Sequence, residues 1–102
     1  MSEVPMQPIN SSVEIWDSLV DKNFDFYYAL RNRNWNYRIE VWRLTTSGVY
    51  ERLWMSNPLF KYSGVSLAAS GRTLVIAYSR SSTRGSETPY LPYFTTIPNL
   101  LA

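Results

Sequence analysis

From Asn23 onward, the apolar residues of this chain recur at every second position, which is the period of a β-strand that buries one face. The stretch "FDFYYAL" begins this pattern, and "YRIEVWRL" and "VYERLWM" continue it. The last two stretches are separated by "TTSG", which has the composition of a three-residue hairpin loop, because Gly48 can take a left-handed backbone at no steric cost. The pattern predicts an antiparallel meander of three strands over residues 24–55.

The register of this meander decides which side chains share a face, because a shift of one residue turns every side chain to the other face. Counting outward from the "TTSG" loop places apolar side chains opposite one another, and the first hairpin is paired in the same way. The predicted pairs are Leu44–Tyr50, Arg43–Glu51, Trp42–Arg52, Val41–Leu53, Glu40–Trp54 and Ile39–Met55 in the second hairpin, and Phe26–Val41, Tyr28–Ile39 and Leu30–Tyr37 in the first. This register predicts one face that carries Tyr27, Trp42, Tyr50 and Trp54, with Arg52 between them.

A second meander of three strands is predicted over residues 59–96, after a break at Pro58, whose missing amide cannot join a ladder. Its hairpin "LFKYSGVSLAASGRTLVIAYS" turns at Gly71 and places Gly64 opposite Ile76. The nearly apolar "TLVIAYS" is typical of a central strand buried on both faces. The letters Leu-x-x-Ser-Gly occur in both hairpins, which indicates either an internal duplication or two similar meanders.

The N-terminal part of the chain shows the period of a helix. Ser11 followed by Glu14 fits a capping box, in which a hydroxyl and a carboxylate satisfy the free amides of a first helical turn. The apolar residues at helical spacing are Ile15, Trp16, Leu19 and Val20. They predict a short amphipathic helix over residues 12–22, preceded by an extended arm over residues 1–11. The expected fold is therefore a single, mostly β domain of about six antiparallel strands in two packed meanders, with one short helix.

The composition lacks the residues of several classes of chemistry. The chain has no cysteine and no histidine, so it lacks the thiolates of zinc sites, the usual general base near neutral pH and the commonest metal ligand. Its four glycines are isolated, so no phosphate-binding loop is present. The first residues show no basic region followed by an apolar run, and no apolar run approaches the ~20 residues that a membrane helix needs. We therefore expect a non-enzymatic, intracellular protein without cofactor, metal or membrane span.

Two tyrosine-rich meanders, "FDFYYALRNRNWNYRIEVWRL" and "FKYSGVSLAASGRTLVIAYS", stand in a short chain without cysteine or histidine. In these features the whole chain resembles the small proteins of filamentous viruses of hyperthermophilic archaea, in particular those of an Acidianus filamentous virus. The resemblance implies a viral protein that acts inside an archaeal cell. It supplies no functional residues.

The stretch "RNRNWNYR", between the first two predicted strands, has two interpretations. Asparagines tolerate left-handed turn geometry, so the arginines could be solvated charges at a hairpin tip. Arginines interleaved with aromatics are also the residues that bind single-stranded nucleic acid, by phosphate pairing and base stacking. With the later loop "SRSSTRG", the residues of this nucleic-acid alternative are Arg31, Arg33, Trp35, Arg38, Arg80 and Arg84.

The aromatic face of the first meander is the leading candidate for a binding site. Either the helix and the second meander cover both faces of the first meander, or part of this face stays open in a groove between the two β units. Trp, Tyr and Arg dominate binding hot spots, and a groove beside a free strand edge accepts an extended peptide by strand addition. The predicted contact residues are Tyr27, Trp42, Tyr50, Arg52 and Trp54. The sequence thus predicts a protein- or peptide-binding module, with nucleic-acid binding second and a minor structural role in a virion third. The same face could instead close a homodimer.

Overall fold

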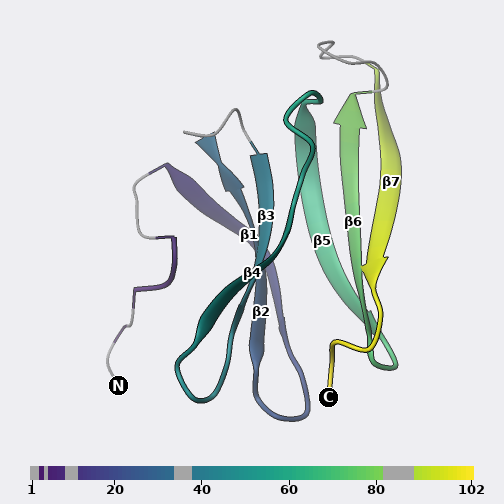
Figure 1. The fold of residues 1–102 in the computed structure, drawn as a ribbon. Helices are drawn as coiled ribbons and strands as arrows, with labels where there is room; N and C mark the ends of the chain where they lie inside the picture. Colours follow the sequence, from purple (N-terminus) through teal and green to yellow (C-terminus); the bar gives the residue numbers. More distant parts are fainter. Residues whose placement is uncertain (1–2, 4, 9–11, 34–37, 82–88) are drawn as a thin grey trace.

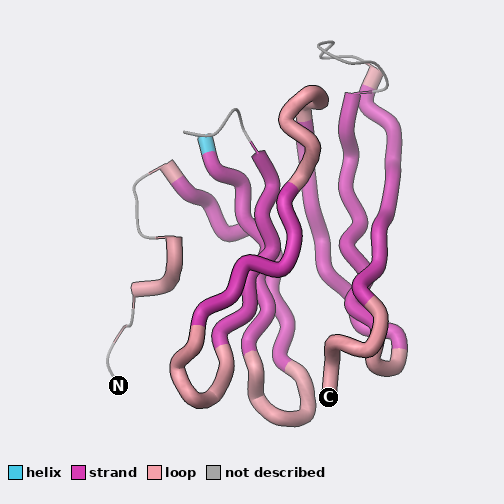
Figure 2. The backbone as a smooth tube through the Cα atoms, viewed as in Figure 1, coloured by secondary structure: helices cyan, strands magenta, loops and turns pink. Residues whose placement is uncertain are grey.

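The computed structural model describes residues 3, 5–8, 12–33, 38–81 and 89–102, and within them the chain forms seven β-strands (Figure 1). The strands are β1 (Val13–Val20), β2 (Phe26–Asn32), β3 (Arg38–Leu44), β4 (Tyr50–Met55), β5 (Tyr62–Ser70), β6 (Thr73–Ser81) and β7 (Tyr90–Ile97). They form a four-stranded sheet in the order β1-β2-β3-β4 and a three-stranded sheet in the order β5-β6-β7, with antiparallel neighbours throughout. Figure 2 shows that strands make up nearly all of the regular structure. The predicted mostly β class is confirmed.

The predicted helix over residues 12–22 is wrong, because this segment forms strand β1. β1 pairs with β2, and a bulge at Trp16 shifts the register between Ile15 and Asp17. A bulge places two consecutive residues opposite one residue of the partner strand, so the spacing of side chains on one face grows from two to three. Spacings of three and four between apolar residues, which predict a helix, therefore arise here in a bulged strand.

The register of β2 against β3 differs from the predicted one by three residues. The observed pairs are Phe26–Leu44, Tyr28–Trp42 and Leu30–Glu40. The predicted pairs Phe26–Val41 and Tyr28–Ile39 are therefore wrong, and Leu30–Tyr37 includes a residue outside the described part of the chain. Because the shift is odd, it exchanges the two faces, so that Tyr28 rather than Tyr27 lies beside Trp42. Four consecutive residues of β2, from Tyr27 to Leu30, are fully buried, and such a strand has no polar face from which its register can be read.

The "TTSG" loop is confirmed as a three-residue hairpin loop. The amide of Thr45 donates to the carbonyl oxygen of Val49 over 2.9 Å, and Gly48 has a φ of +88°. The predicted pairs Leu44–Tyr50, Arg43–Glu51 and Trp42–Arg52 are confirmed next to this loop. Beyond them, a bulge pairs Val41 with Trp54 and Glu40 with Met55, so the predicted pairs Val41–Leu53, Glu40–Trp54 and Ile39–Met55 are wrong. The bulge turns Trp54 toward the three-stranded sheet and away from Trp42.

The hairpin of β5 and β6 turns through two residues, Gly71 and Arg72. Gly71 has a φ of +58°, so its predicted place at the tip is confirmed. The predicted pair Gly64–Ile76 is wrong, because Gly64 lies opposite Ser79. The two hairpins that share the letters Leu-x-x-Ser-Gly therefore have loops of different length.

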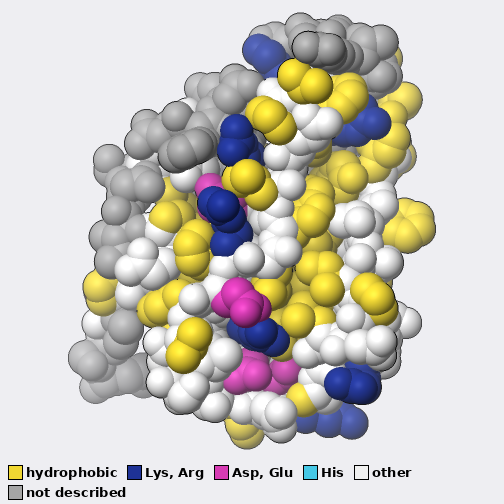
Figure 3. Space-filling view, in the orientation of Figure 1, with side chains coloured by type: hydrophobic (Ala, Val, Ile, Leu, Met, Phe, Trp, Pro, Cys, Tyr) yellow, Lys and Arg dark blue, Asp and Glu magenta, His cyan; other side chains and the backbone are white. Residues whose placement is uncertain are grey.

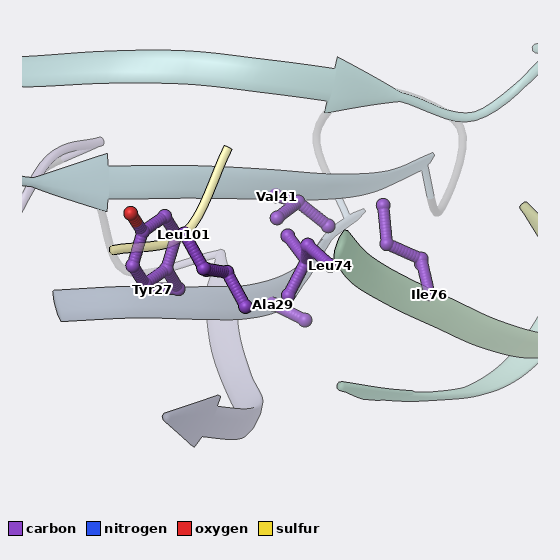
Figure 4. Close-up of a cluster of buried hydrophobic side chains, with 6 residues drawn as sticks. All are labelled: Tyr27, Ala29, Val41, Leu74, Ile76 and Leu101. Atoms are coloured by element: carbon purple, nitrogen blue, oxygen red, sulfur yellow. The ribbon is translucent and has the colours of Figure 1, made fainter. Parts of the chain in front are cut away.

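The two sheets pack face to face and bury a common core (Figure 4). Its members, none more than 2% exposed, are Tyr27, Ala29 and Val41 from the four-stranded sheet, Leu74 and Ile76 from β6, and Leu101 near the C-terminal end. β5 is the strand of the second sheet that runs nearest to β1, β2 and β3. Between β1 and β5, the carboxylate of Asp17 accepts a hydrogen bond of 2.7 Å from the backbone amide of Leu67. The sheets are therefore joined along this side by a side chain.

The carboxylate of Asp21 connects the loop between β1 and β2 with the core and with the last residues of the chain. Its hydrogen-bond donors are the hydroxyl of Tyr27 at 2.9 Å and the amides of Asn23, Asp25 and Ala102 at 3.0, 3.1 and 3.2 Å. Partial burial acts to raise the pKa of Asp21, but these hydrogen bonds outweigh burial and hold the pKa below its ordinary value.

We expect Asp21 to make the stability depend on pH in acid solution. A carboxyl whose pKa is lowered by folding contributes stability that is complete above its unfolded pKa of about 3.9 and is lost as the pH falls through the folded pKa. The unfolding free energies of wild type and Asp21→Asn should differ by about 1–2 kcal/mol near pH 7 and pH 5, and the difference should shrink below about pH 4. Urea unfolding at each pH measures this difference. A difference that stays constant down to about pH 3 would contradict the prediction.

Candidate functional site

The face of the four-stranded sheet that points away from β5, β6 and β7 carries aromatic side chains in two rows across the strands. One row is Phe26, Leu44 and Tyr50, and the next is Tyr28, Trp42 and Arg52. The rings of Phe26 and Tyr28 stack with their centroids 5.4 Å apart. We call Phe26, Tyr28, Trp42 and Tyr50 the outer aromatic face.

A segment of the chain itself lies on the outer aromatic face. This arm segment is residues 5–8, Pro-Met-Gln-Pro, and it runs along the side of the four-stranded sheet opposite to the three-stranded sheet (Figure 1). The hydroxyl of Tyr28 donates to the carbonyl oxygen of Gln7, and that of Tyr50 donates to the carbonyl oxygen of Pro5 over 3.2 Å. Tyr28 is fully buried although it faces away from the second sheet. Both tyrosines therefore bind main-chain atoms of the arm segment, and the arm segment covers Tyr28.

Burial also decides the protonation state of Tyr28. Removing the hydroxyl from water disfavours the phenolate, so burial raises the pKa of Tyr28 above its ordinary value, and the nearby Tyr50 and Glu40 act in the same direction. The Tyr28 hydroxyl is therefore a hydrogen-bond donor throughout the physiological pH range.

A buried carboxylate orients the indole of Trp42. Glu40 is 3% exposed and accepts hydrogen bonds of 3.0 Å from Nε1 of Trp42 and from the side-chain amide of Asn32. Nη1 of Arg52 lies 3.6 Å from Oε1 of Glu40. These donors compensate the charge, which burial alone would destabilise strongly. The ring of Trp42 is consequently held in one orientation on the outer aromatic face.

The five residues predicted to contact a partner do not share one surface. Trp42, Tyr50 and Arg52 lie together on the outer side of the four-stranded sheet, next to the confirmed "TTSG" loop. Tyr27 and Trp54 lie on the inner side, where Tyr27 is fully buried in the core and the Trp54 ring packs 5.4 Å from that of Tyr78. These five residues therefore do not line a groove between the two sheets.

Two parts of this site were not predicted from the sequence. The first is Tyr28, because the predicted register places Tyr27 beside Trp42 in its stead. The second is the contact of the arm segment with this face, because the sequence predicts only an extended arm there, whereas the observed segment bends at Gln7 and Pro8. The spacing of Pro5 and Pro8 is the signal that could have indicated it, because Pro-x-x-Pro is the pattern of extended ligands that dock on aromatic surfaces.

Charged side chains follow the edge strand of the four-stranded sheet. Figure 3 shows them as a column where Figure 1 places β4, with hydrophobic side chains gathered beside the column over β5 and β6. Glu51 and Arg52 of β4 are exposed, and Glu51 forms an ion pair of 2.6 Å with Arg43 of β3. Charges on an edge strand disfavour pairing with a further strand. The face of this sheet is therefore better suited to bind a peptide than its β4 edge.

The residues of the nucleic-acid alternative are found at one end of the molecule. The structure places Arg31, Arg33, Arg38 and Arg80 there, at or near the ends of β2, β3 and β6 (Figure 1). Trp35 and Arg84 fall outside the described residues. Glu14 forms ion pairs with Arg31 at 3.4 Å and with Arg33 at 3.2 Å. The alternation of strands thus places four of the six predicted residues at the same end of the molecule, Arg80 on one sheet and the other three on the other.

No family model, curated protein or solved structure matches this chain. The resemblance to proteins of archaeal filamentous viruses therefore stays a prediction. Across the described ranges, the structure has no helix of the length and apolar character needed to cross a membrane. In that same part of the chain, no three metal-ligating side chains come together as a metal site.

Proposed function

We propose that this chain is a non-enzymatic module that binds proline-containing peptide segments on the outer aromatic face. The observation that supports this proposal is the arm segment, two of whose carbonyl oxygens accept hydrogen bonds from Tyr28 and Tyr50. A segment held by its main chain in this way is an example of the ligand class that the face can accept. The partner is therefore a protein that presents such a segment.

Proline-containing segments suit an aromatic face for a physical reason. Each proline ring fixes one backbone dihedral, so fixing a segment with two prolines on a surface costs less conformational entropy than fixing a flexible one. Its carbonyl oxygens have no partners within the segment and accept hydrogen bonds from tyrosine hydroxyls, while its rings pack on aromatic side chains. Here Tyr28 and Tyr50 supply the donors, and Phe26 and Trp42 supply ring surface.

The arm segment competes with an external ligand for this face. A segment tethered to its own binding site acts at an effective concentration of the order of millimolar. An external peptide has to displace it, which lowers the apparent affinity of the face. The outer aromatic face therefore selects partners that bind more tightly than the arm segment or that are present at high local concentration.

We expect the full-length chain to bind a fluorescein-labelled peptide with the sequence of residues 3–10, measured by fluorescence anisotropy. Changing Pro5 and Pro8 together to glycine removes both rings and adds conformational freedom to the arm segment, which weakens its hold on the face. This variant should bind the labelled peptide at least about tenfold more tightly than wild type. Adding Tyr28→Phe and Tyr50→Phe removes two hydroxyls, keeps both rings, and should weaken binding again by about tenfold.

Tyr90→Phe is the matched control, because it removes one hydroxyl from β7, on the other sheet. It should leave the affinity for the peptide unchanged. If the variant with the weakened arm segment keeps the circular dichroism of wild type and still binds no peptide, the proposal is wrong. Equal affinity for a peptide in which both prolines are alanine would contradict the proposed preference for proline.

A further inference from the structure

The end of the molecule where β2 and β6 finish concentrates positive charge. The basic residues there, which we call the basic end, are Arg31, Arg33, Arg38, Lys61 and Arg80. Among the described residues, the acidic side chains near it are Glu14, which is paired with two of these arginines, and Glu40, which is buried and paired with Arg52. The opposite end balances its charges with Lys22, Arg43 and Arg72 against Asp21, Asp25 and Glu51.

The chain between β4 and β5 connects the two sheets at the basic end, and each sheet holds its own basic residues in place there. The amide of Lys61 donates to Oγ of Ser81 over 3.2 Å, and the carbonyl oxygen of Lys61 accepts the Ser81 amide over 2.9 Å. Lys61 therefore lies beside Arg80, the residue before Ser81. On the other sheet, Nη1 of Arg38 lies 3.1 Å from Sδ of Met55, where β4 enters the loop that leads to Lys61.

Aromatic rings lie among these cations. The guanidinium of Arg80 lies between the rings of Phe60 and Tyr93, at 3.9 Å from each centroid. Tyr90 begins β7 opposite Ser81, one residue beyond Arg80, and is 38% exposed. The two rings cover both faces of the Arg80 guanidinium, whereas the exposed ring of Tyr90, on the other face of the three-stranded sheet, is a flat surface on which a base can stack.

The ion pairs with Glu14 orient two of the arginines. A hydrogen bond from the indole of Trp16, and then the contact with Arg31, lower the pKa of Glu14, so it is ionised at neutral pH. Arg33 contacts this carboxylate through Nε, and its side chain is 48% exposed. Arg33 is therefore held at the rim of the basic end while much of it remains in contact with solvent.

We propose that the basic end binds single-stranded nucleic acid, with Arg33, Arg38 and Lys61 contacting phosphates and Tyr90 stacking on a base. Cations alternate there with rings, which is the combination that single strands need, since their bases are unpaired and offer flat faces. An acidic protein would use the cations and leave the rings without a role. This site is separate from the outer aromatic face, so the two proposals stand or fail independently.

The test uses the full-length chain and a fluorescein-labelled oligothymidylate of about 15 nucleotides, long enough to span one small domain. Anisotropy titrations near 50 mM and 200 mM salt should show a loss of affinity of about 20-fold, because three neutralised phosphates give a slope of about −2 against the logarithm of salt. The double variant Arg33→Gln with Arg38→Gln should weaken binding at the lower salt by about tenfold and reduce the slope by about 1.4. Tyr90→Leu should weaken binding by at least about fivefold and leave the slope unchanged.

The matched control is Lys22→Gln with Arg72→Gln, which removes the same charge from the opposite end. It should weaken binding by less than about twofold, because distant charges are screened at these salt concentrations. Thermal unfolding checks that each variant folds. If Arg33→Gln with Arg38→Gln does not fold, Lys61→Gln provides the same test. Absence of binding at the lower salt, or an equal loss in the two double variants, would overturn the proposal. Displacement of the oligonucleotide by polyglutamate at equal charge concentration would overturn it in favour of an acidic protein partner.

Discussion

Replacing Tyr27 with alanine should lower the free energy of unfolding by about 3–5 kcal/mol. The ring is fully buried between the two sheets, so its removal loses the transfer free energy of a large side chain and leaves a cavity that the paired strands cannot close. Urea unfolding followed by far-ultraviolet circular dichroism measures the change. Tyr27→Phe keeps the ring, loses the hydrogen bonds of the hydroxyl with Asp21 and Arg43, and should cost about 1–2 kcal/mol.

This pair of variants distinguishes a core residue from a contact residue. A side chain at a binding surface tolerates truncation with little effect on folding, whereas a core ring does not. A loss below about 1 kcal/mol in Tyr27→Ala would show that the sheets do not close over this ring. It would return Tyr27 to the set of candidates for partner binding.

Replacing Glu40 with alanine should lower the free energy of unfolding by about 2–4 kcal/mol. The substitution leaves the indole N–H of Trp42 and the amide of Asn32 without their acceptor, and it removes the counter-charge of Arg52. Arg52→Ala is the contrasting variant. Because Arg52 is about half exposed and lies 3.6 Å from the carboxylate, its loss should cost less than about 1 kcal/mol.

The emission spectrum of the tryptophans gives a second measurement for these variants. Loss of its hydrogen bond should release the Trp42 indole in Glu40→Ala and shift the emission, whereas Arg52→Ala keeps that bond. Peptide affinity on the outer aromatic face should fall in the first variant and change little in the second. Equal destabilisation by the two variants would show that the ion pair, and not the hydrogen bonds, is the main interaction of Glu40.

The parts of the fold that could be predicted from the sequence lie next to its most specific turn. Gly48 permits the left-handed residue of a three-residue loop, and this loop determines the register for the three residue pairs nearest to it. The register can be predicted from the loop only as far as the bulge before Trp54. An inserted residue cannot be recognised reliably in the alternation of apolar residues. The same limitation explains β1, where the bulge at Trp16 imitates the period of a helix.

The candidate site could be predicted only in part, because it depends on which face each strand buries. Trp42, Tyr50 and Arg52 were placed together because their register follows from the loop. The sequence does not place Tyr28 with them, because β2 is apolar on both faces and its pattern leaves the pairing open. The arm segment covers Tyr28 through a contact between residues that are about twenty positions apart in the sequence. The periodicity of apolar residues does not reveal such a contact.

Asp17 lies at the boundary between the two sheets. If β5 paired with β1, all seven strands would belong to one continuous ladder, and the Leu67 amide is a group that such pairing would use. The carboxylate occupies that amide instead, at the level where the bulge interrupts β1. One acidic residue thus occupies a backbone donor that a neighbouring strand would otherwise use, at the side where the two sheets meet.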